Sequence, residues 1–158
     1  MKDLLAFIIA DKEYAVDIAH VIRVLKGADI ISVPETPDYV EGVINFDNNV
    51  VPVINIKKKL SINEDTADEI RYVIIAQIHG SFVGLIVDTI TDVITIDAAD
   101  ITPPEGLLKD ARYLMGIIKK EESMTFVMDI EKFAAEDSIM IEQTRGKVEI
   151  RSSTENKE

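Results

Sequence analysis

The sequence of 158 residues contains no cysteine. A disulfide framework, a thiolate metal site and a cysteine nucleophile are therefore excluded, and we expect a reducing, cytoplasmic environment. The chain also lacks an apolar run approaching the roughly 20 residues that cross a bilayer, since the N-terminal run over residues 4–10 ends at Asp11. The N-terminus has neither the basic start nor the small-residue cleavage site of a secretory signal, so we expect a soluble protein without direct membrane insertion.

Basic residues are few: 17 lysines and arginines stand against 29 aspartates and glutamates, and the net charge is −12. At long range this charge repels phosphate backbones and anionic lipid headgroups, which argues against a nucleic-acid partner. An acidic surface can equally be a plain solubility feature. A chain of this length is expected to form one domain with a sizeable core.

Residues that would support catalysis or cofactor binding are equally scarce. The two histidines, His20 and His79, both fall at predicted turns, where a lone histidine is usually solvated. No glycine-rich phosphate loop and no Gly-x-Ser-x-Gly motif is present. We therefore expect no catalytic residue, no metal and no cofactor. A small hydrolase or ligand-binding protein would need a sheltered pocket of converging carboxylates, whereas the acidic residues here lie in predicted turns and loops.

An internal repeat is the strongest positive signal. Residues 42–60 and 116–134 share a glycine that opens an apolar strand, a polar turn, and a second apolar strand that ends near a lysine. Upstream, residues 4–25 overlay residues 73–94 without a gap. The early offset of 69 and the late offset of 74 require one short insertion, in the loop at residues 102–106. The pattern predicts two related β units packed as one body.

Apolar runs and turn residues predict a succession of hairpins. We expect hairpins over residues 4–16, 43–56, 71–87 and 113–129, a turn at residues 17–20 followed by a strand at 21–25, and a strand at 92–96. Asp47, Asn48 and Asn49 tolerate positive φ and should form a hairpin turn. Pro52 predicts an edge position or a bulge for its strand, because proline cannot donate to a ladder.

Other segments are expected to be helical or irregular. Short helical turns are predicted at residues 38–41, and a helix over residues 129–143. The acidic residues 61–69 should form a mobile surface loop at the boundary between the repeats. Residues 146–158 are expected to be a charged, flexible tail.

Four segments carry a resemblance to a known family: residues 7–16, 33–45, 50–56 and 83–88. The second and third together are the specific ones, because they read P-x-x-P-x-Y-V-x-G-V-I-N followed closely by V-V-P-V-I. On these residues the chain resembles the CheW family of chemotaxis coupling proteins across about residues 3–134.

The resemblance implies a mainly β fold of two small five-stranded β-barrels around a shared apolar core, with short helices. It implies a single domain over residues 1–145, with subdomain repeats at about 3–60 and 72–134. It also implies a non-catalytic adaptor that joins the regulatory domain of a histidine kinase to the cytoplasmic tips of chemoreceptors, with recruitment to membrane-associated receptor arrays. The alternative is a β-barrel binding module of a different two-component or motility system.

The family pattern suggests two groups of contact residues, each with a plainer interpretation. The receptor-facing group is Val21, Arg23 and Asp47, and the weaker kinase-facing group is Ile31, Val33 and Gly42. Ordinary core packing explains the two valines and the isoleucine equally well. Gly42, like its repeat partner Gly116, more simply marks a close backbone approach or a positive φ.

Arg23 and Asp47 depart from the family, which commonly has Glu at the first position and Arg at the second. Both signs are reversed together. One hypothesis is an ion pair with exchanged ends, which would contribute only about 0.2–1 kcal/mol to stability and would act mainly on partner choice. The alternative is two independent solvated charges.

Overall fold

The structure is a computed structural model that describes residues 1–62 and 71–134. Strands dominate the described residues. In chain order they are β1 (Lys2–Ile9), β2 (Lys12–Asp17), β3 (Val21–Lys26), β4 (Val40–Phe46), β5 (Asn49–Asn55), β6 (Tyr72–Ile78), β7 (Ser81–Val87), β8 (Thr89–Ile96), β9 (Leu114–Lys119) and β10 (Met124–Met128). The helical elements are short: α1 (Ile56–Lys59), α2 (Ile130–Phe133) and the 3₁₀ turns η1 (Ile18–His20), η2 (Ala98–Asp100) and η3 (Gly106–Asp110).

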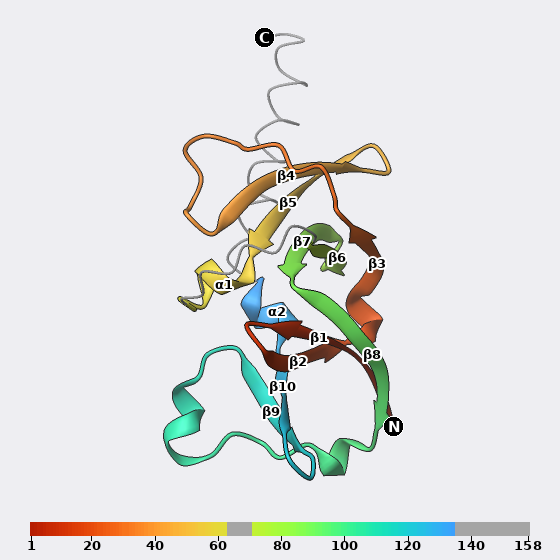
Figure 1. Ribbon diagram of the computed structural model, residues 1–158, viewed down its shortest axis with the longest axis vertical. Helices are drawn as coiled ribbons and strands as arrows, with labels where there is room; N and C mark the ends of the chain where they lie inside the picture. The colour runs from red at the N-terminus through yellow and green to blue at the C-terminus, as the bar shows by residue number, and fades with distance from the viewer. Residues whose placement is uncertain (63–70, 135–158) are drawn as a thin grey trace, which may run out of the picture.

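The strands form two five-stranded sheets. Sheet A has the order β8-β1-β2-β10-β9 and sheet B the order β3-β6-β7-β5-β4. In Figure 1, sheet B occupies the upper part of the described body and sheet A the lower part, with α1 and α2 between them. The predicted mainly β fold of two five-stranded units is confirmed.

The sheets do not coincide with the repeats in the sequence. We call residues 3–60 the first repeat and residues 72–134 the second. Sheet A combines the first repeat's β1 and β2 with the second repeat's β8, β9 and β10, and sheet B makes the reciprocal exchange. By the repeat offsets of 69 and 74, strands β1 to β5 correspond in order to strands β6 to β10. Replacing each strand of sheet A by its counterpart gives the strand order of sheet B. The duplication is therefore visible in space as two hairpins, each completed by three strands of the other repeat.

Two parallel ladders join the repeats inside the sheets. In sheet B, Val53 on β5 pairs with Gly84 on β7, and in sheet A, Val127 on β10 pairs with Ala15 on β2. The chain crosses between the sheets at η1 and at Asp88, where β7 passes almost directly into β8 (Figure 1). These crossings leave no route by which one repeat could form a complete sheet alone.

A shared apolar core lies between the sheets. Its largest buried members come from both sheets and from both short helices: Phe7, Ile9, Ile54, Ile56, Ile74, Ile78, Leu85, Ile130 and Phe133. Each such side chain contributes about 1.5–3 kcal/mol on burial. Two smaller clusters fill the individual sheets, one around Val51, Val53 and Ile75 in sheet B and one around Leu4 and Val127 in sheet A.

The ammonium group of Lys59 contacts aromatic rings of both repeats where the repeats meet. Its Nζ lies 5.1 Å from the ring centre of Tyr39 in the first repeat. On the other side it lies 5.6 Å from the ring centre of Tyr113 and 4.5 Å from that of Phe133, and it donates a hydrogen bond to the Phe133 carbonyl. A cation among aromatic faces is held by their quadrupoles, so this lysine ties α1 to α2.

Two sequence expectations hold only in part. Pro52 does not lie on an edge strand, because β5 is an inner strand between β7 and β4, but the β4–β5 ladder has the other expected feature close by, an irregularity between Val40 and Gly42. The proline is tolerated because its partner Val43 exchanges both backbone hydrogen bonds with Ile31 instead, and because the parallel ladder with β7 begins only at Val53. The helical turn expected at residues 38–41 is shortened to a turn at residues 38–39, closed by the Val40 N–H donating to the Pro37 carbonyl at 3.0 Å, because β4 already begins at Val40.

Other expectations are confirmed in part. All the predicted hairpins, the turn before β3 and the strand at β8 are present. The helix expected from residue 129 begins as α2, whose first turn is capped by Asp129 Oδ1 accepting from the Lys132 backbone N–H. The remainder of that helix, most of the loop at residues 61–69 and the tail at 146–158 lie outside the described residues.

Glu13 on β2 gathers a polar network at one end of sheet A. Its carboxylate accepts hydrogen bonds from Thr91 Oγ1 at 3.0 Å, Lys120 Nζ at 2.6 Å and Thr125 Oγ1. Partial burial alone would raise the pKa of Glu13, but these hydrogen bonds and the Lys120 charge together lower it below its ordinary value. The network links β2, β8 and β10 with the residue that follows β9.

Replacing Glu13 by glutamine removes the charge that these donors surround. We expect Glu13→Gln to lower the free energy of unfolding by about 1–2 kcal/mol at neutral pH. Because the pKa of Glu13 is lower in the folded than in the unfolded chain, its contribution is complete above the unfolded pKa and is lost as the pH falls through the folded pKa. Urea unfolding of both proteins from neutral to acid pH measures the difference.

Glu122, exposed in the β9–β10 turn, provides the matched control. Glu122→Gln should change the free energy of unfolding little at any pH. A deficit of Glu13→Gln that stays constant into acid would contradict the proposed role of the ionised carboxylate.

Candidate functional site

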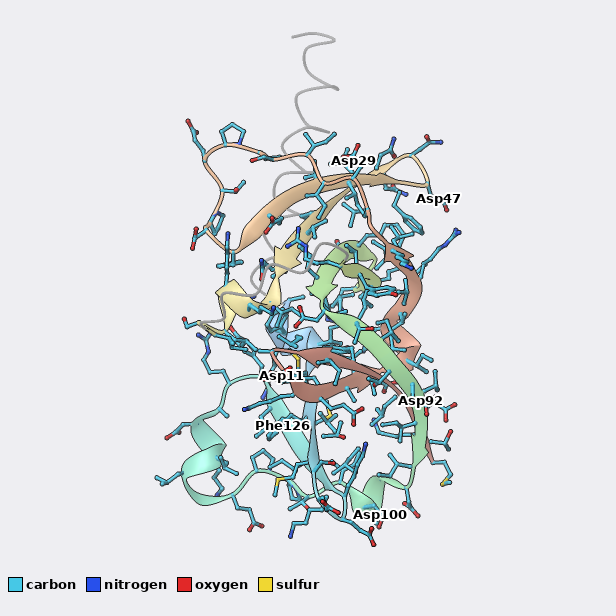
Figure 2. All side chains as sticks on the ribbon, viewed as in Figure 1. Asp11, Asp29, Asp47, Asp92, Asp100 and Phe126 are labelled. Carbon is cyan, nitrogen blue, oxygen red and sulfur yellow. The ribbon has the colours of Figure 1, made fainter. Side chains whose placement is uncertain are left out.

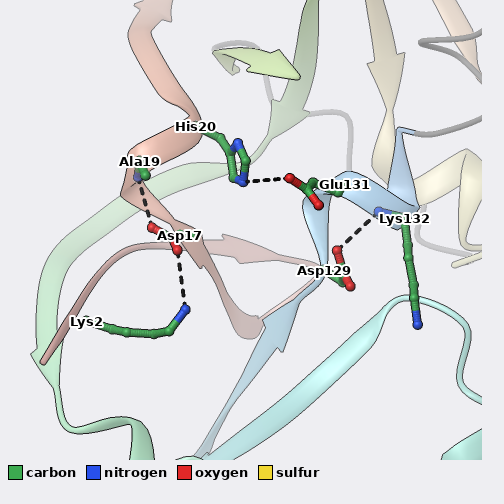
Figure 3. Close-up of polar contacts among 7 residues, drawn as sticks. All are labelled: Lys2, Asp17, Ala19, His20, Asp129, Glu131 and Lys132. Carbon is green, nitrogen blue, oxygen red and sulfur yellow. Dashed lines mark hydrogen bonds and ion pairs between the residues drawn. The ribbon is translucent and has the colours of Figure 1, made fainter. Parts of the chain in front are cut away.

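The start of β3 is held in place by contacts with sheet A and with α2 (Figure 3). Asp17 Oδ1 accepts a hydrogen bond of 2.9 Å from the Ala19 backbone N–H, and Asp17 Oδ2 lies 3.4 Å from Lys2 Nζ. The Ala19 hydrogen bond is the main reason that the pKa of Asp17 lies below its ordinary value. His20 Nε2 approaches Glu131 Oε2 at 3.7 Å. These contacts therefore fix the position of the 3₁₀ turn η1 and of the start of β3.

A β-bulge then determines which β3 side chains face solvent. Val21 pairs with Ala76 and Arg23 pairs with Ile75, so Ile22 is the extra residue between them. Val21 is half-buried against the shared core, whereas Ile22 is 46% exposed and Arg23 is exposed. The sequence analysis missed Ile22, because an apolar residue in a predicted strand is taken for core and no local signal marks the bulge.

Asp47 lies at the tip of the β4–β5 hairpin (Figure 2). Asp47 and Asn48 adopt positive φ values of 52° and 64°, as predicted for this turn. Asn49 Nδ2 donates to the Asp47 carbonyl at 3.1 Å and so stabilises the tip. The tip lies on the same side of the body as β3 (Figure 1). We call Val21, Arg23 and Asp47, as placed here, the β3 surface.

Of the two hypotheses for Arg23 and Asp47, the ion pair is not formed. Among the described residues, no salt bridge within 4.0 Å and no hydrogen bond joins the two side chains, and both are exposed. Water solvates two exposed charges about as well as they would stabilise each other, so Arg23 and Asp47 can lie on the same side of the molecule without forming an ion pair. Both charges are presented to solvent.

Gly42, of the second predicted group, lies on β4, the outer strand of sheet B, and Ile31 and Val33 lie in the segment that precedes this strand. Ile31 and Val43 exchange backbone hydrogen bonds of 2.8 Å in both directions, so the segment before β4 covers part of that edge. The Ile31 side chain is 61% exposed, and Val33 is half-buried. We call Ile31, Val33 and Gly42 the β4 edge.

Gly42 makes this edge pairing possible. A Cβ at Gly42 would lie 2.2 Å from the Ile31 carbonyl oxygen, well inside van der Waals contact. Its repeat partner Gly116 has the same role, because a Cβ there would meet Ile101 Cγ2 at 2.4 Å and the Thr102 carbonyl oxygen at 2.9 Å. The predicted close backbone approach is confirmed at both glycines, while the contact of Gly42 with a kinase stays a prediction.

The titratable side chains of the described residues bear on the possibility of catalysis. They hold no group of three or more His, Cys, Asp or Glu side chains that could bind a metal ion. The two carboxyls in this part of the chain with a shifted pKa, Glu13 and Asp17, are both shifted downward, opposite to the shift expected of a general acid. In the described ranges, no helix is long and apolar enough to cross a membrane.

Comparisons with known proteins agree with the geometry. A family model described as a CheW-like domain matches residues 3–138. The chain is 30% identical over 134 residues to the chemotaxis protein CheW of Helicobacter pylori, covering 84% of this chain and 81% of the relative. It is 35% identical over 131 residues to that of Bacillus subtilis, covering 81% and 83%. The crystal structure of the scaffolding protein TtCheW from Thermoanaerobacter tengcongensis superposes with a TM-score of 0.74 at 35% identity, covering 80% and 88%.

The clash at Gly42 generates a stability prediction. Gly42→Ala should lower the free energy of unfolding by about 2–4 kcal/mol, because β4 or residue 31 must move. Gly27→Ala is the matched control, since Gly27 also has a positive φ, of 66°, but has no atom within 4 Å of an added Cβ. Its loss should be about 1 kcal/mol. Urea unfolding compares the two variants, and equal losses would refute the steric role of Gly42.

Proposed function

Because the chain belongs to the CheW-like family, we propose that it is an adaptor that couples the cytoplasmic tips of chemoreceptors to the regulatory domain of a histidine kinase. Membership of this family makes the chain a chemotaxis scaffold and not an enzyme. The identity of the two partners is the proposal. Through the receptors, the adaptor would be recruited to membrane-associated arrays.

One observation supports this proposal most directly. The order β3-β6-β7-β5-β4 sets β3 and β4 at opposite edges of sheet B. Val21 and Arg23 on one edge strand and Ile31 against the other therefore offer two binding regions on one sheet, while Asp47 lies at the tip of the β4–β5 hairpin. An adaptor needs such a separation, because receptor and kinase must be held at the same time.

The β3 surface suits a partner that is selected by charge. Arg23 and Asp47 are both exposed and unpaired with each other, so their charges are available to a partner. Exposed charges add little affinity but reject partners of the wrong sign. We assign this surface to the receptor tip.

The β4 edge suits a more apolar partner. Ile31 is 61% exposed although its backbone is fixed by two hydrogen bonds to Val43. A rigid, exposed apolar side chain loses little conformational entropy when a partner covers it. We assign this edge to the kinase regulatory domain.

Calorimetric titration of the chain with a kinase regulatory domain and, separately, with a receptor signalling fragment tests the assignment. We expect Ile31→Thr to weaken kinase binding about tenfold and to leave receptor binding unchanged. Val93→Thr is the control, because Val93 is 49% exposed on β8 of sheet A and belongs to neither surface. Binding to neither partner by the wild-type chain would end the proposal.

A double-mutant cycle tests the β3 surface. Arg23→Glu and Asp47→Arg should each weaken receptor binding, and the double variant should recover part of the loss if both charges face one partner site. Since the two side chains form no pair in the free protein, any coupling arises in the complex. Strictly additive losses would show that the two charges act independently.

The reversed signs at Arg23 and Asp47 also favour a second candidate function. A chain with both charges reversed could serve a different two-component or motility system, with the same sheet edges and other partners. Titration against kinases with and without a CheW-like regulatory domain distinguishes the two. Preference for the chemotaxis kinase supports coupling, and equal or reversed preference supports the alternative.

A further inference from the structure

The two sheets place opposite chemistry at four equivalent positions. In sheet A the positions are polar and form the Glu13 network; in sheet B they are apolar. By the repeat offsets, Glu13 corresponds to Phe82, Thr91 to Ile22, Lys120 to Phe46 and Thr125 to Val51. Every member of the polar network therefore has an apolar counterpart.

Three of the four apolar counterparts are packed together. Phe46 and Phe82 meet edge to face, with ring centres 6.0 Å apart and planes at 77°. Val51 is fully buried in the same cluster. Ile22 differs, because it remains 46% exposed.

The exposure of Ile22 follows from a bulge that both sheets share. Thr91 is the extra residue of β8 opposite the Ala6–Phe7 step, and Ile22 is the extra residue of β3. In sheet A the bulged Thr91 turns its hydroxyl to Glu13. In sheet B the bulged isoleucine has no polar atom to satisfy, and its side chain remains 46% exposed.

We propose that Ile22 is a specificity-determining contact of the β3 surface, and that its occupant is a receptor segment carrying an apolar side chain beside a carboxylate. This inference rests on the proposed function and deepens it. Arg23, next to Ile22, is exposed and forms no ion pair with any described residue. A cation beside an apolar side chain is complementary to such a segment.

Space for the occupant exists on this side of the sheet. β3 is an edge strand, and no other strand of the described chain pairs with its outer side. The side chain of Ile22 is β-branched and stiff, and the contacts of η1 fix where β3 begins. The partner therefore meets a rigid apolar contact instead of a mobile one.

The repeat supplies the substitution that tests this inference. Ile22→Thr places at β3 the residue that the equivalent bulge of β8 carries, so the fold is expected to accept it. Ile22→Val keeps an apolar, β-branched side chain and should retain binding. Val93→Thr makes a similar change at an exposed position on β8 and is the matched control.

Calorimetric titration would use the cytoplasmic signalling fragment of a chemoreceptor and, separately, the kinase regulatory domain, both from the organism that encodes this chain. We expect Ile22→Thr to weaken binding of the receptor fragment about tenfold, with kinase binding unchanged. Raising the salt concentration should weaken wild-type receptor binding, and Arg23→Gln should reduce that dependence.

The outcomes separate this inference from the function on which it rests. Receptor binding by wild type together with an Ile22→Thr change under threefold overturns the role of Ile22 and leaves the adaptor function standing. An equal loss in Val93→Thr overturns it too, because the effect would not be local to β3. Failure of the wild-type chain to bind either partner overturns both.

Discussion

The parallel ladders between the repeats, β2 with β10 and β5 with β7, are the constraint on which the rest of the structure depends. Together with the antiparallel ladders of β1 with β8 and of β6 with β3, they complete the first hairpin of each repeat with strands of the other, so both halves must be present before either sheet is complete. The shared core then packs residues of both sheets, such as Phe7 and Ile54, around Phe133. Lys59 adds a charged contact between the two repeats. The result is one body, although the sequence is a duplication.

This construction explains why two similar halves can serve different partners. Because the repeats exchange strands, the two sheets have the same strand order. Different functions of the two sheets must therefore come from residues that differ at equivalent positions. The contrast between the Glu13 network and the Phe46–Phe82 cluster is such a difference. In sheet A the four polar groups satisfy one another, whereas in sheet B the apolar set leaves Ile22 at the surface beside Arg23. The proposed coupling therefore depends on side chains that differ between two sheets of the same strand order.

Much of this could be predicted from residue patterns and some could not. The hairpins, the Asp47 turn and the close approach at Gly42 follow from local chemistry that the sequence displays. The exchange of strands does not, because the two repeats share most of their apolar positions, and a shared pattern does not distinguish pairing within one repeat from pairing between the two. The edge position expected of Pro52 was wrong for a related reason. Its partner Val43 exchanges backbone hydrogen bonds with Ile31 and needs no donor from Pro52. Ile22 was overlooked because a bulge depends on register, which is a property of two strands together.

Hydrogen exchange measured along the chain tests the central claim, that one rigid sheet holds two partners at separate edges. The chain would be compared alone, with a receptor signalling fragment, with a kinase regulatory domain, and with both. The account predicts added protection at β3 and the Asp47 turn with the receptor fragment, at residues 31–33 and β4 with the kinase domain, and at both places in the mixture of three. Protection of one common region by both partners, or loss of one pattern when the other partner is added, would contradict it.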